Sequence, residues 1–231
     1  MNDIRTITLD LDDTLWAIQP VIKRAERRLY AWLQEHYPRI TAAVSPAAIL
    51  ELRERIVAEY PDQGHDFTFL RRAVLRKLAE TAGYGEGLVD KAMAVFDAVR
   101  NDVRVYPDVR PTLVVLRRSY KLLAVTNGNA NLDTIGISEL FDEVISAAVA
   151  GAAKPAREIF DVAVRAGGAT AEQTLHVGDH PEHDVQGALD AGLKAVWINR
   201  HGVAWPKNLQ QPDGVIRNVG QLISILGSAN R

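Results

Sequence analysis

Short apolar runs alternate with amphipathic stretches over much of this 231-residue chain. The first run, from Ile4 to Leu11, is rich in aliphatic and β-branched residues and ends in acidic ones, which predicts a buried strand that leads into a loop. Later runs with the length of strands, and the helical patterns between them, predict a parallel sheet covered by helices on both faces. The runs lie at 122–126, 144–149, 174–177 and 195–199, and the helical patterns at about 109–118, 156–166 and 185–191.

The stretch from Pro20 to about Arg100 has helical periodicity throughout. Val21, Ala25 and Leu29 share one face of its first helix, and prolines and glycines separate the helices that follow. Because one short strand cannot bury itself alone, the opening strand must belong to the later sheet. We therefore predict an α/β fold, a doubly wound Rossmann-like parallel sheet core (residues 1–16 and 105–231) with an inserted all-helical cap domain (17–104).

Composition narrows the functional classes. Hydrophobic residues make up 47% of the chain and charged residues 24%, which is typical of an ordered globular protein, and the net charge of −2 argues against a nucleic-acid partner. The absence of cysteine excludes a thiolate nucleophile and a sulfur-ligated metal. With no secretory leader or membrane-length apolar run in the sequence, we expect a cytoplasmic monomer or homodimer without a membrane partner.

Acidic residues follow the opening strand, at the edge where open α/β sheets bind ligands. Side chains alternate along an extended chain, so Asp10 and Asp12 are expected to point the same way. Two carboxylates in such close proximity indicate one of two arrangements. Either they bind a divalent metal together, or one is a nucleophile and the other carries a proton. The alternative is an acidic loop that caps a helix.

Two further groups of polar residues follow predicted strands. Thr126, Asn127 and Asn129 come after the run at 122–126, where a hydroxyl and backbone N–H groups can donate to phosphoryl oxygens; the alternative is a simple Asn-Gly turn. Lys154, followed by Pro155 at the expected first turn of a helix, can neutralise a nucleophile or a phosphoryl group. The alternative there is a solvated surface lysine.

The fourth group follows the run at 174–177. Gly178 permits a tight turn, Asp179 stands at the strand end, and Asp184 returns about one helical turn later. Carboxylate oxygens with water are the ligands that Mg²⁺ prefers. His180 and His183 raise the alternative of a zinc or iron site, which the predominance of carboxylates disfavours.

These four groups, in this order, resemble the motifs of the haloacid dehalogenase-like superfamily. That family has a DxDxT nucleophile loop, a Ser or Thr after the second strand, a Lys and a GDxxxxD loop, and all four are present. The resemblance covers the whole core, and the helical insertion looks like the C1-type cap of the family. It implies an enzyme, a phosphoric monoester hydrolase that acts through an aspartyl-phosphate intermediate on a small-molecule phosphate ester.

The resemblance also implies roles for individual residues. Asp10 would be the nucleophile, and Asp12 the acid that protonates the leaving oxygen and then the base that activates water. Thr126 and Asn127 would hold phosphoryl oxygens, and Lys154 would offset their charge. Such help is needed because a dianionic monoester repels a carboxylate nucleophile.

A magnesium site is implied as well. Mg²⁺ would be held by the carboxylate of Asp10, the backbone carbonyl of Asp12 and the carboxylate of Asp179, with Asp184 orienting that shell. No other cofactor is expected.

The flanks of the motifs look like the flavin-pathway branch of the family, whose members hydrolyse flavin mononucleotide and the ribitylaminouracil phosphate that precedes riboflavin. The matching stretches are 10–16, 125–130 and 176–179. Trp16 and Asn129 are possible substrate contacts there, the first by stacking on a planar heterocycle. The alternative for Trp16 is simple packing in the core.

Other activities remain open at this point. Phosphomutases share all four motifs, whereas 2-haloacid dehalogenases of the same superfamily lack the second aspartate, so Asp12 argues against dehalogenation. A non-enzymatic phosphoacceptor would also combine an Asp, a Thr and a Lys around Mg²⁺. A carboxylate at position 12 should shorten the life of its phosphoaspartate, and the long helical insertion is foreign to such a receiver.

Overall fold

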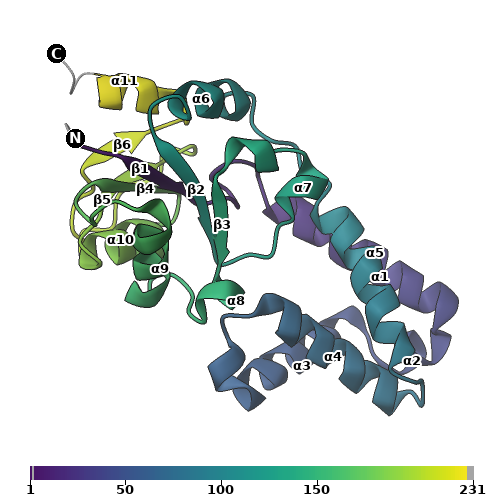
Figure 1. Cartoon of the computed structure of the whole chain (residues 1–231). Coiled ribbons are helices and arrows are strands. Elements are labelled where there is room, and N and C mark those ends of the chain that lie inside the picture. The colour runs from purple at the N-terminus through teal and green to yellow at the C-terminus, as the bar shows by residue number, and fades with distance from the viewer. Residues whose placement is uncertain (2, 228–231) are drawn as a thin grey trace. The chain divides into compact units, whose positions relative to one another are not determined.

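The computed structural model describes residue 1 and residues 3–227 (Figure 1). Contacts between residues divide the chain into two units. The first comprises 1–17, 104–128 and the chain from 132 onward, and the second comprises 18–103 with 129–131. We call the second the helical unit, because among its described residues the regular elements are all helices. The roles of catalytic core and cap stay a prediction.

The predicted parallel sheet forms the centre of the first unit, and among the described residues it has six strands in the order β3-β2-β1-β4-β5-β6. The opening strand β1 lies in the middle, where Leu9 is level with Ala124 of β2 and with Val177 of β4. Its four residues are all buried, which explains the continuous apolar run. The strands are β1 (Thr6–Leu9), β2 (Lys121–Thr126), β3 (Glu143–Ser146), β4 (Thr174–Gly178), β5 (Lys194–Ile198) and β6 (Gly214–Ile216).

Helices cover both faces of this sheet. Helices α9 and α10 lie on one side and α6 and α11 on the other (Figure 1). Phe160 and Ala163 of α9 are fully buried in a cluster that includes Val125 and Trp197 of the sheet. The helical elements of this unit are α6 (Val109–Leu116), α7 (Leu132–Ile135), η2 (Ser138–Leu140), α8 (Ala147–Ala150), α9 (Arg157–Gly167), η3 (Pro181–Gln186), α10 (Gly187–Asp190) and α11 (Gln221–Gly227).

Some element boundaries differ from the predicted ones. The apolar run at 144–149 is a strand only as far as Ser146, whose hydroxyl accepts a hydrogen bond from the N–H of Val149 and begins α8. Pro155 does not stand in the first turn of α9, which begins at Arg157. The helix expected at 185–191 is a π turn followed by α10, and the three-residue strand β6 was not predicted because it is too short for a periodicity.

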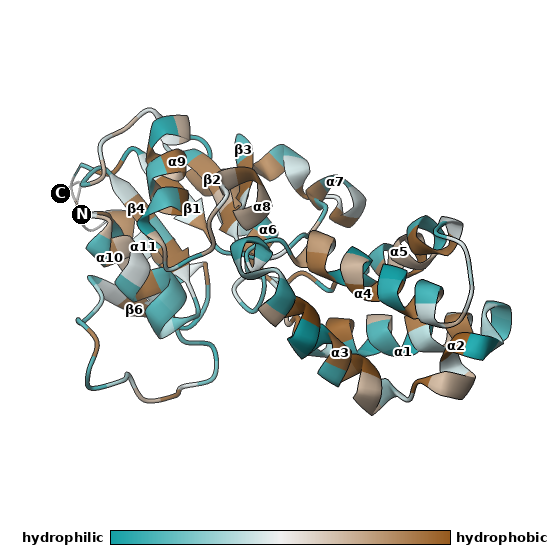
Figure 2. Cartoon of the chain, turned by 90° about the horizontal axis from the view of Figure 1, so that it is seen from below, coloured by the Kyte–Doolittle hydropathy of each residue, from teal (hydrophilic) through white to brown (hydrophobic). Residues whose placement is uncertain are grey.

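The helical unit has a hydrophobic core of its own. Helices α1 and α5 pack along each other, and Ala25, Leu33, Ala92 and Phe96 between them are buried. Apolar residues gather along one side of its helices, with polar residues on the other (Figure 2). The elements are α1 (Gln19–His36), α2 (Pro38–Ala43), α3 (Pro46–Glu59), η1 (Pro61–Gln63), α4 (Phe67–Thr81) and α5 (Gly87–Arg100). Within the described chain, none of the helices combines the length and apolar character that crossing a bilayer requires.

Candidate active site

The carboxyl ends of β1, β2 and β4 bring the sequence-predicted residues together. Asp10 follows β1 directly and donates its N–H to the carbonyl of Val177 on β4, at 2.9 Å. Thr126 is the last residue of β2, and Asp179 follows β4. Because these three strands are parallel neighbours, their ends meet at one edge of the sheet.

Lys154 is the centre of the site. Its ammonium donates to Oδ1 of Asp10 at 2.6 Å, to Oδ1 of Asp184 at 2.6 Å and to the carbonyl of Val125 at 2.9 Å. The side chain is 2% exposed, so this is a buried ion cluster and not the solvated surface lysine that was the alternative. An ammonium has three protons, and all are used here. The charge is therefore fixed in position.

The charges of this cluster depend on one another. Burial acts to lower the pKa of Lys154, but the carboxylates of Asp10 and Asp184 outweigh it and hold the pKa above its ordinary value. Burial raises the pKa of Asp10 well above the usual range, and the carboxylates of Asp184 and Asp179 add to the rise, whereas Lys154 opposes it. The pKa of Asp184 is lowered, because Lys154 and a hydrogen bond from His176 outweigh burial.

Three carboxylates form an acidic cluster beside the ammonium. Asp10, Asp179 and Asp184 each offer an oxygen, and these oxygens lie within 4.8 Å of one another. Burial first, and then repulsion from Asp184, raises the pKa of Asp179 to about 7. With all groups ionised, three carboxylates and one ammonium leave a net charge of −2. A divalent cation fits this cluster in charge and in ligand chemistry.

Asp184 is held by the loop that surrounds it. Its Oδ2 accepts the backbone N–H of His180 at 2.9 Å. Gly178 makes this approach possible, because a Cβ on that residue would lie 2.2 Å from Cγ of Asp184. Glycine is thus required at position 178 by contact and not by an unusual backbone angle.

His176 is a site residue that the sequence analysis did not identify. It lies fully buried on β4, level with Thr8 of β1, and its Nδ1 is 2.8 Å from the Thr8 hydroxyl. Its Nε2 is 3.3 Å from Oδ1 of Asp184, and burial lowers its pKa. A polar residue inside the apolar run at 174–177 was the available indication.

Asn127 orients Lys154 through the backbone. Its side-chain Nδ2 donates to the carbonyl of Lys154 at 2.9 Å, and its Oδ1 accepts the N–H of the same residue at 2.7 Å. The side-chain amide of Asn127 is therefore engaged by the backbone of Lys154, and the phosphate contact of Asn127 stays a prediction. The hydroxyl of Thr126 accepts the N–H of Gly128 at 2.9 Å, which keeps its own proton for donation.

Asp12 lies outside the acidic cluster, although Asp10 and Asp12 were expected to share one space. Its Oδ1 accepts a hydrogen bond from the indole N–H of Trp16 at 2.9 Å. The next residue, Asp13, has a φ of 60°, so the chain turns out of the extended conformation directly after Asp12. Trp16 is completely buried, which leaves no ring face for a substrate and agrees with simple packing.

The remaining candidates lie elsewhere. Asn129 belongs to the helical unit, where its Nδ2 donates to the hydroxyl of Thr68 at 3.0 Å. His180 and His183 stack on each other with ring centroids 3.9 Å apart. Within the described residues, no histidine shares a metal-ligating group with the carboxylates, so the structure offers nothing for the zinc or iron alternative.

Arg200, after β5, supports the loop that follows Asp10. Its guanidinium donates twice to the carbonyl of Thr14, at 3.1 and 2.9 Å, and pairs with Asp108. The hydroxyl of Thr14 in turn donates to Oδ1 of Asp179 at 3.3 Å. The position of Arg200 at the end of a predicted strand was the indication that the sequence analysis did not use.

Comparison with known proteins identifies relatives of this chain. A family model described as haloacid dehalogenase-like hydrolase matches residues 4–192. The chain is 32% identical to 5-amino-6-(5-phospho-D-ribitylamino)uracil phosphatase YigB of Escherichia coli, over 86% of this chain and 84% of that protein. It is 31% identical to a glyceraldehyde 3-phosphate phosphatase of Methanopyrus kandleri, over 85% of this chain and 84% of that protein.

A solved structure is also similar to this fold along its whole length. It is a 2-haloacid dehalogenase from Pseudomonas syringae pv. tomato, with a TM-score of 0.93 and 38% sequence identity over 97% of this chain and 99% of that one. The activities named for these three proteins differ.

Proposed function

Because the chain belongs to the haloacid dehalogenase-like hydrolase family, we propose that it hydrolyses a phosphate monoester of a small metabolite, with Asp10 as the nucleophile and Mg²⁺ as the cofactor. The chain is an enzyme, a phosphatase of this family. The observation that carries the proposal is the buried contact of Lys154 with both Asp10 and Asp184, next to the third carboxylate of Asp179.

The nucleophile needs a charge-balanced surrounding. One oxygen of Asp10 is held by Lys154 at 2.6 Å, which orients the carboxylate for attack on phosphorus. The bond that forms joins Asp10 to phosphorus, and the bond that breaks joins phosphorus to the alcohol oxygen. The Thr126 hydroxyl and nearby backbone N–H groups would donate to the phosphoryl oxygens as their charge redistributes.

The acidic cluster supports the choice of cofactor. Asp10 and Asp179 would hold Mg²⁺ together with the backbone carbonyl of Asp12, and Asp184 would orient them. When bound, the cation would offset the charge that keeps an anionic ester away from a carboxylate.

Proton transfer falls to Asp12. The indole of Trp16 donates to Oδ1 of this carboxylate and orients it. The carboxyl group of Asp12 would give a proton to the departing alcohol. The same carboxylate would then accept a proton from the water that attacks the aspartyl phosphate, which returns Asp10 to its free form.

The similarity to YigB supports a phosphate of the riboflavin pathway as the substrate, either the ribitylaminouracil phosphate or flavin mononucleotide. A screen of kcat/KM over these compounds, sugar phosphates and nucleotides tests this choice. Equal rates with all of them would favour a broad specificity over the flavin-pathway assignment.

The first test of the reaction uses p-nitrophenyl phosphate. The wild-type protein should release nitrophenol in the presence of Mg²⁺ and lose this activity when the metal is chelated. Asp10→Asn should lower kcat by roughly 10³-fold or more while the circular dichroism spectrum is retained, because the amide is not a nucleophile. Activity that survives both chelation and Asp10→Asn would refute the proposed metal and nucleophile together.

One observation makes dehalogenation the competing activity to test, namely the TM-score of 0.93 with a protein named as a 2-haloacid dehalogenase. In that reaction Asp10 would attack the carbon that carries the halogen, the carbon–halogen bond would break, and water would hydrolyse the resulting ester. Halide release from 2-chloropropionate distinguishes the two reactions. We expect none, because Asp12 and Asp179 supply a proton carrier and metal ligand that dehalogenation does not need.

A further inference from the structure

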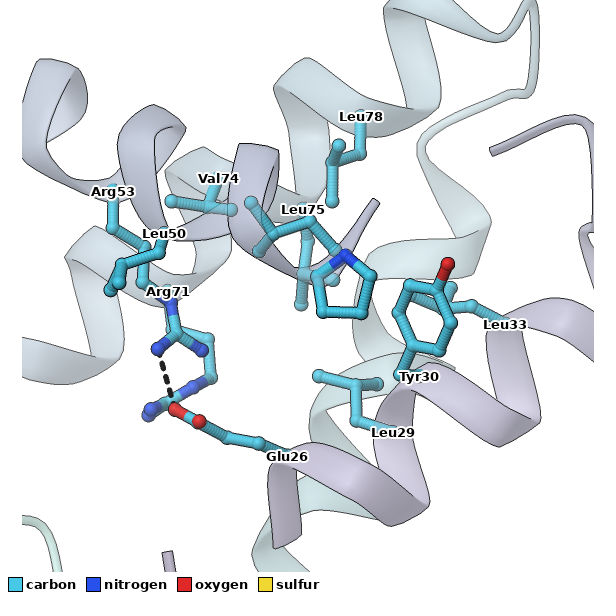
Figure 3. A pocket seen from close by; sticks show the side chains of 12 residues that line it. Glu26, Leu29, Tyr30, Leu33, Leu50, Arg53, Arg71, Val74, Leu75 and Leu78 are labelled. Atoms are coloured by element: carbon cyan, nitrogen blue, oxygen red, sulfur yellow. Dashed lines mark hydrogen bonds and ion pairs between the residues drawn. The ribbon is translucent and has the colours of Figure 1, made fainter. Parts of the chain in front are cut away.

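The helical unit contains a cavity that is lined by its own residues alone. It has a volume of about 180 Å³ and lies between α1, α3 and α4. Its walls are mostly apolar, and Figure 3 shows the side chains of Leu29, Leu33, Leu75 and Leu78 on one side of it. For comparison, an apolar cavity of about 150 Å³ is large enough for a benzene molecule. The space thus suits one aromatic ring or a short chain.

One end of this cavity is charged. Glu26, Arg53 and Arg71 gather there, with Leu50 beside the two arginines (Figure 3). Arg53 donates to Glu26 at 2.5 Å, and both side chains are only about a third exposed. Arg71 stacks on the ring of Phe96, with its guanidinium carbon 3.5 Å from the ring centroid. Its Nε is buried and has no hydrogen-bond partner among the described residues.

The charges at this end do not balance. Arg53 and Arg71 line it, and Glu26 is the one carboxylate among the described lining residues. Two cations and one anion leave one positive charge in a partly buried place. Burial and the repulsion from Arg53 lower the pKa of Arg71 to about 10, so it stays protonated at neutral pH.

A neighbouring hollow of about 500 Å³ shares Glu26, Tyr30 and Pro46 with this cavity. Lys23 and Arg27 line that hollow, and no second carboxylate besides Glu26 does. An anion that approaches from this side therefore meets a positive surface before it reaches the cavity.

We propose that this cavity of the helical unit is a binding site for a small amphipathic monocarboxylate, such as an arylacetate. Its apolar body fills the space between the leucines, and its carboxylate is held by the guanidinium of Arg71. The planar fork of arginine matches a carboxylate in two parallel hydrogen bonds. A monoanion neutralises the single excess charge, whereas a phosphate dianion would exceed it.

The test uses the full-length protein, with phenylacetate as the probe and 2-phenylethanol as its uncharged match. Inorganic phosphate and Mg²⁺ are present throughout to saturate the proposed site around Lys154. Because binding and not turnover is measured, the result does not depend on whether the protein is a phosphatase. Titration calorimetry should show saturable binding of phenylacetate and at least tenfold weaker binding of the alcohol. The methyl NMR resonances of Leu29, Val74 and Leu75 should shift with occupancy.

Variants locate the site. Arg71→Gln removes the charge and Leu75→Phe fills the space, and each should weaken phenylacetate at least tenfold. Arg72→Gln is the matched control, since Arg72 is the next residue, does not line the cavity and pairs with Asp90. Its affinity should stay within about twofold of the wild type.

Three results would overturn the proposal. They are the absence of saturable phenylacetate binding to the wild type, equal affinity for 2-phenylethanol, and unchanged affinity in Arg71→Gln or in Leu75→Phe. If Arg71→Gln fails to fold at the assay temperature, Leu75→Phe and the comparison with the alcohol decide the matter without it.

Discussion

Asn127 contacts Lys154 at both its N–H and its carbonyl, so the lysine side chain starts from a fixed main-chain position. Asn127→Ala would remove both hydrogen bonds and leave two partly buried backbone groups unpaired. We expect a loss of about 1–3 kcal/mol of unfolding free energy. A displacement of the ammonium by an ångström would also lower kcat by roughly 10²-fold. Denaturant unfolding and steady-state kinetics measure the two effects.

Asn199 provides the control for this prediction. Its side chain makes the same two-way contact with Val203, donating at 2.8 Å and accepting at 3.0 Å, but in an exposed loop. Asn199→Ala should cost less stability than Asn127→Ala and leave kcat close to the wild-type value. If both variants lost activity equally, the special role of Asn127 at Lys154 would be wrong.

Asp179 predicts a pH dependence of metal binding. Its pKa is raised to about 7, so the metal-free protein keeps a proton there below pH 7, whereas a bound cation requires the carboxylate. The affinity for Mg²⁺ should therefore fall as the pH falls below about 7. At pH 7 binding should release about half a proton from this group, and almost none at pH 9. Calorimetry in buffers of different ionisation enthalpy measures this release.

The raised pKa of Asp179 also makes the free energy of unfolding depend on pH. The direction is opposite to that produced by an ordinary salt-bridged aspartate, whose pKa is lowered. Between the unfolded pKa near 4 and the folded pKa of about 7, the folded chain holds a proton that the unfolded chain has lost. The contribution of Asp179 therefore favours the folded state at low pH and is lost as the pH rises to about 7.

For metal binding, a proton release that does not change between pH 7 and pH 9 would contradict the assignment of Asp179 to the metal.

At the scale of elements, the turn from β4 into η3 depends on Gly178. Gly178→Ala would place a Cβ 2.2 Å from Cγ of Asp184, so the carboxylate would have to move away from Lys154. We expect a loss of about 1–3 kcal/mol of stability and a large fall in kcat. Gly87→Ala is the control, because a Cβ at that residue meets no atom within 4 Å and alanine favours the helix that begins there. Thermal melting of both variants should show opposite shifts, and two equal shifts would refute the steric argument.

The sheet was largely predictable from the sequence, because buried parallel strands are apolar runs and because β1, β2 and β4 are each followed by polar residues. Two kinds of detail were not. The end of β3 at Ser146 depends on a side-chain cap within a continuous apolar run, and β6 has too few residues for a periodicity. The contact of His176 with Thr8 depends on the register between β1 and β4, which a single chain pattern does not contain.

At the scale of the molecule, the helical unit is inserted between β1 and the rest of the sheet. Both of its chain ends lie at one place, since Arg24 near its start pairs with Asp102 near its end at 3.0 Å. Together with its own buried core, this predicts that residues 18–103 fold alone. The excised segment should give a helical circular dichroism spectrum and a cooperative thermal transition.

The complementary segment, residues 104–231, should not fold by itself, because it lacks β1 from the centre of the sheet between β2 and β4. A native-like spectrum for this segment would contradict the central role of β1. A coil spectrum for residues 18–103 would show instead that the helical unit depends on the rest of the chain.

The ammonium of Lys154 has all of its protons engaged by protein oxygens, and the side-chain amide of Asn127 is turned to the lysine backbone. In the proposed reaction, the ammonium of Lys154 and the amide of Asn127 would therefore make no contact with the departing alcohol. Chemistry and substrate preference are then separable properties, and preference can drift during evolution while the reacting centre is kept. The similar proteins carry names that refer to substrates as different as a uracil derivative and a triose.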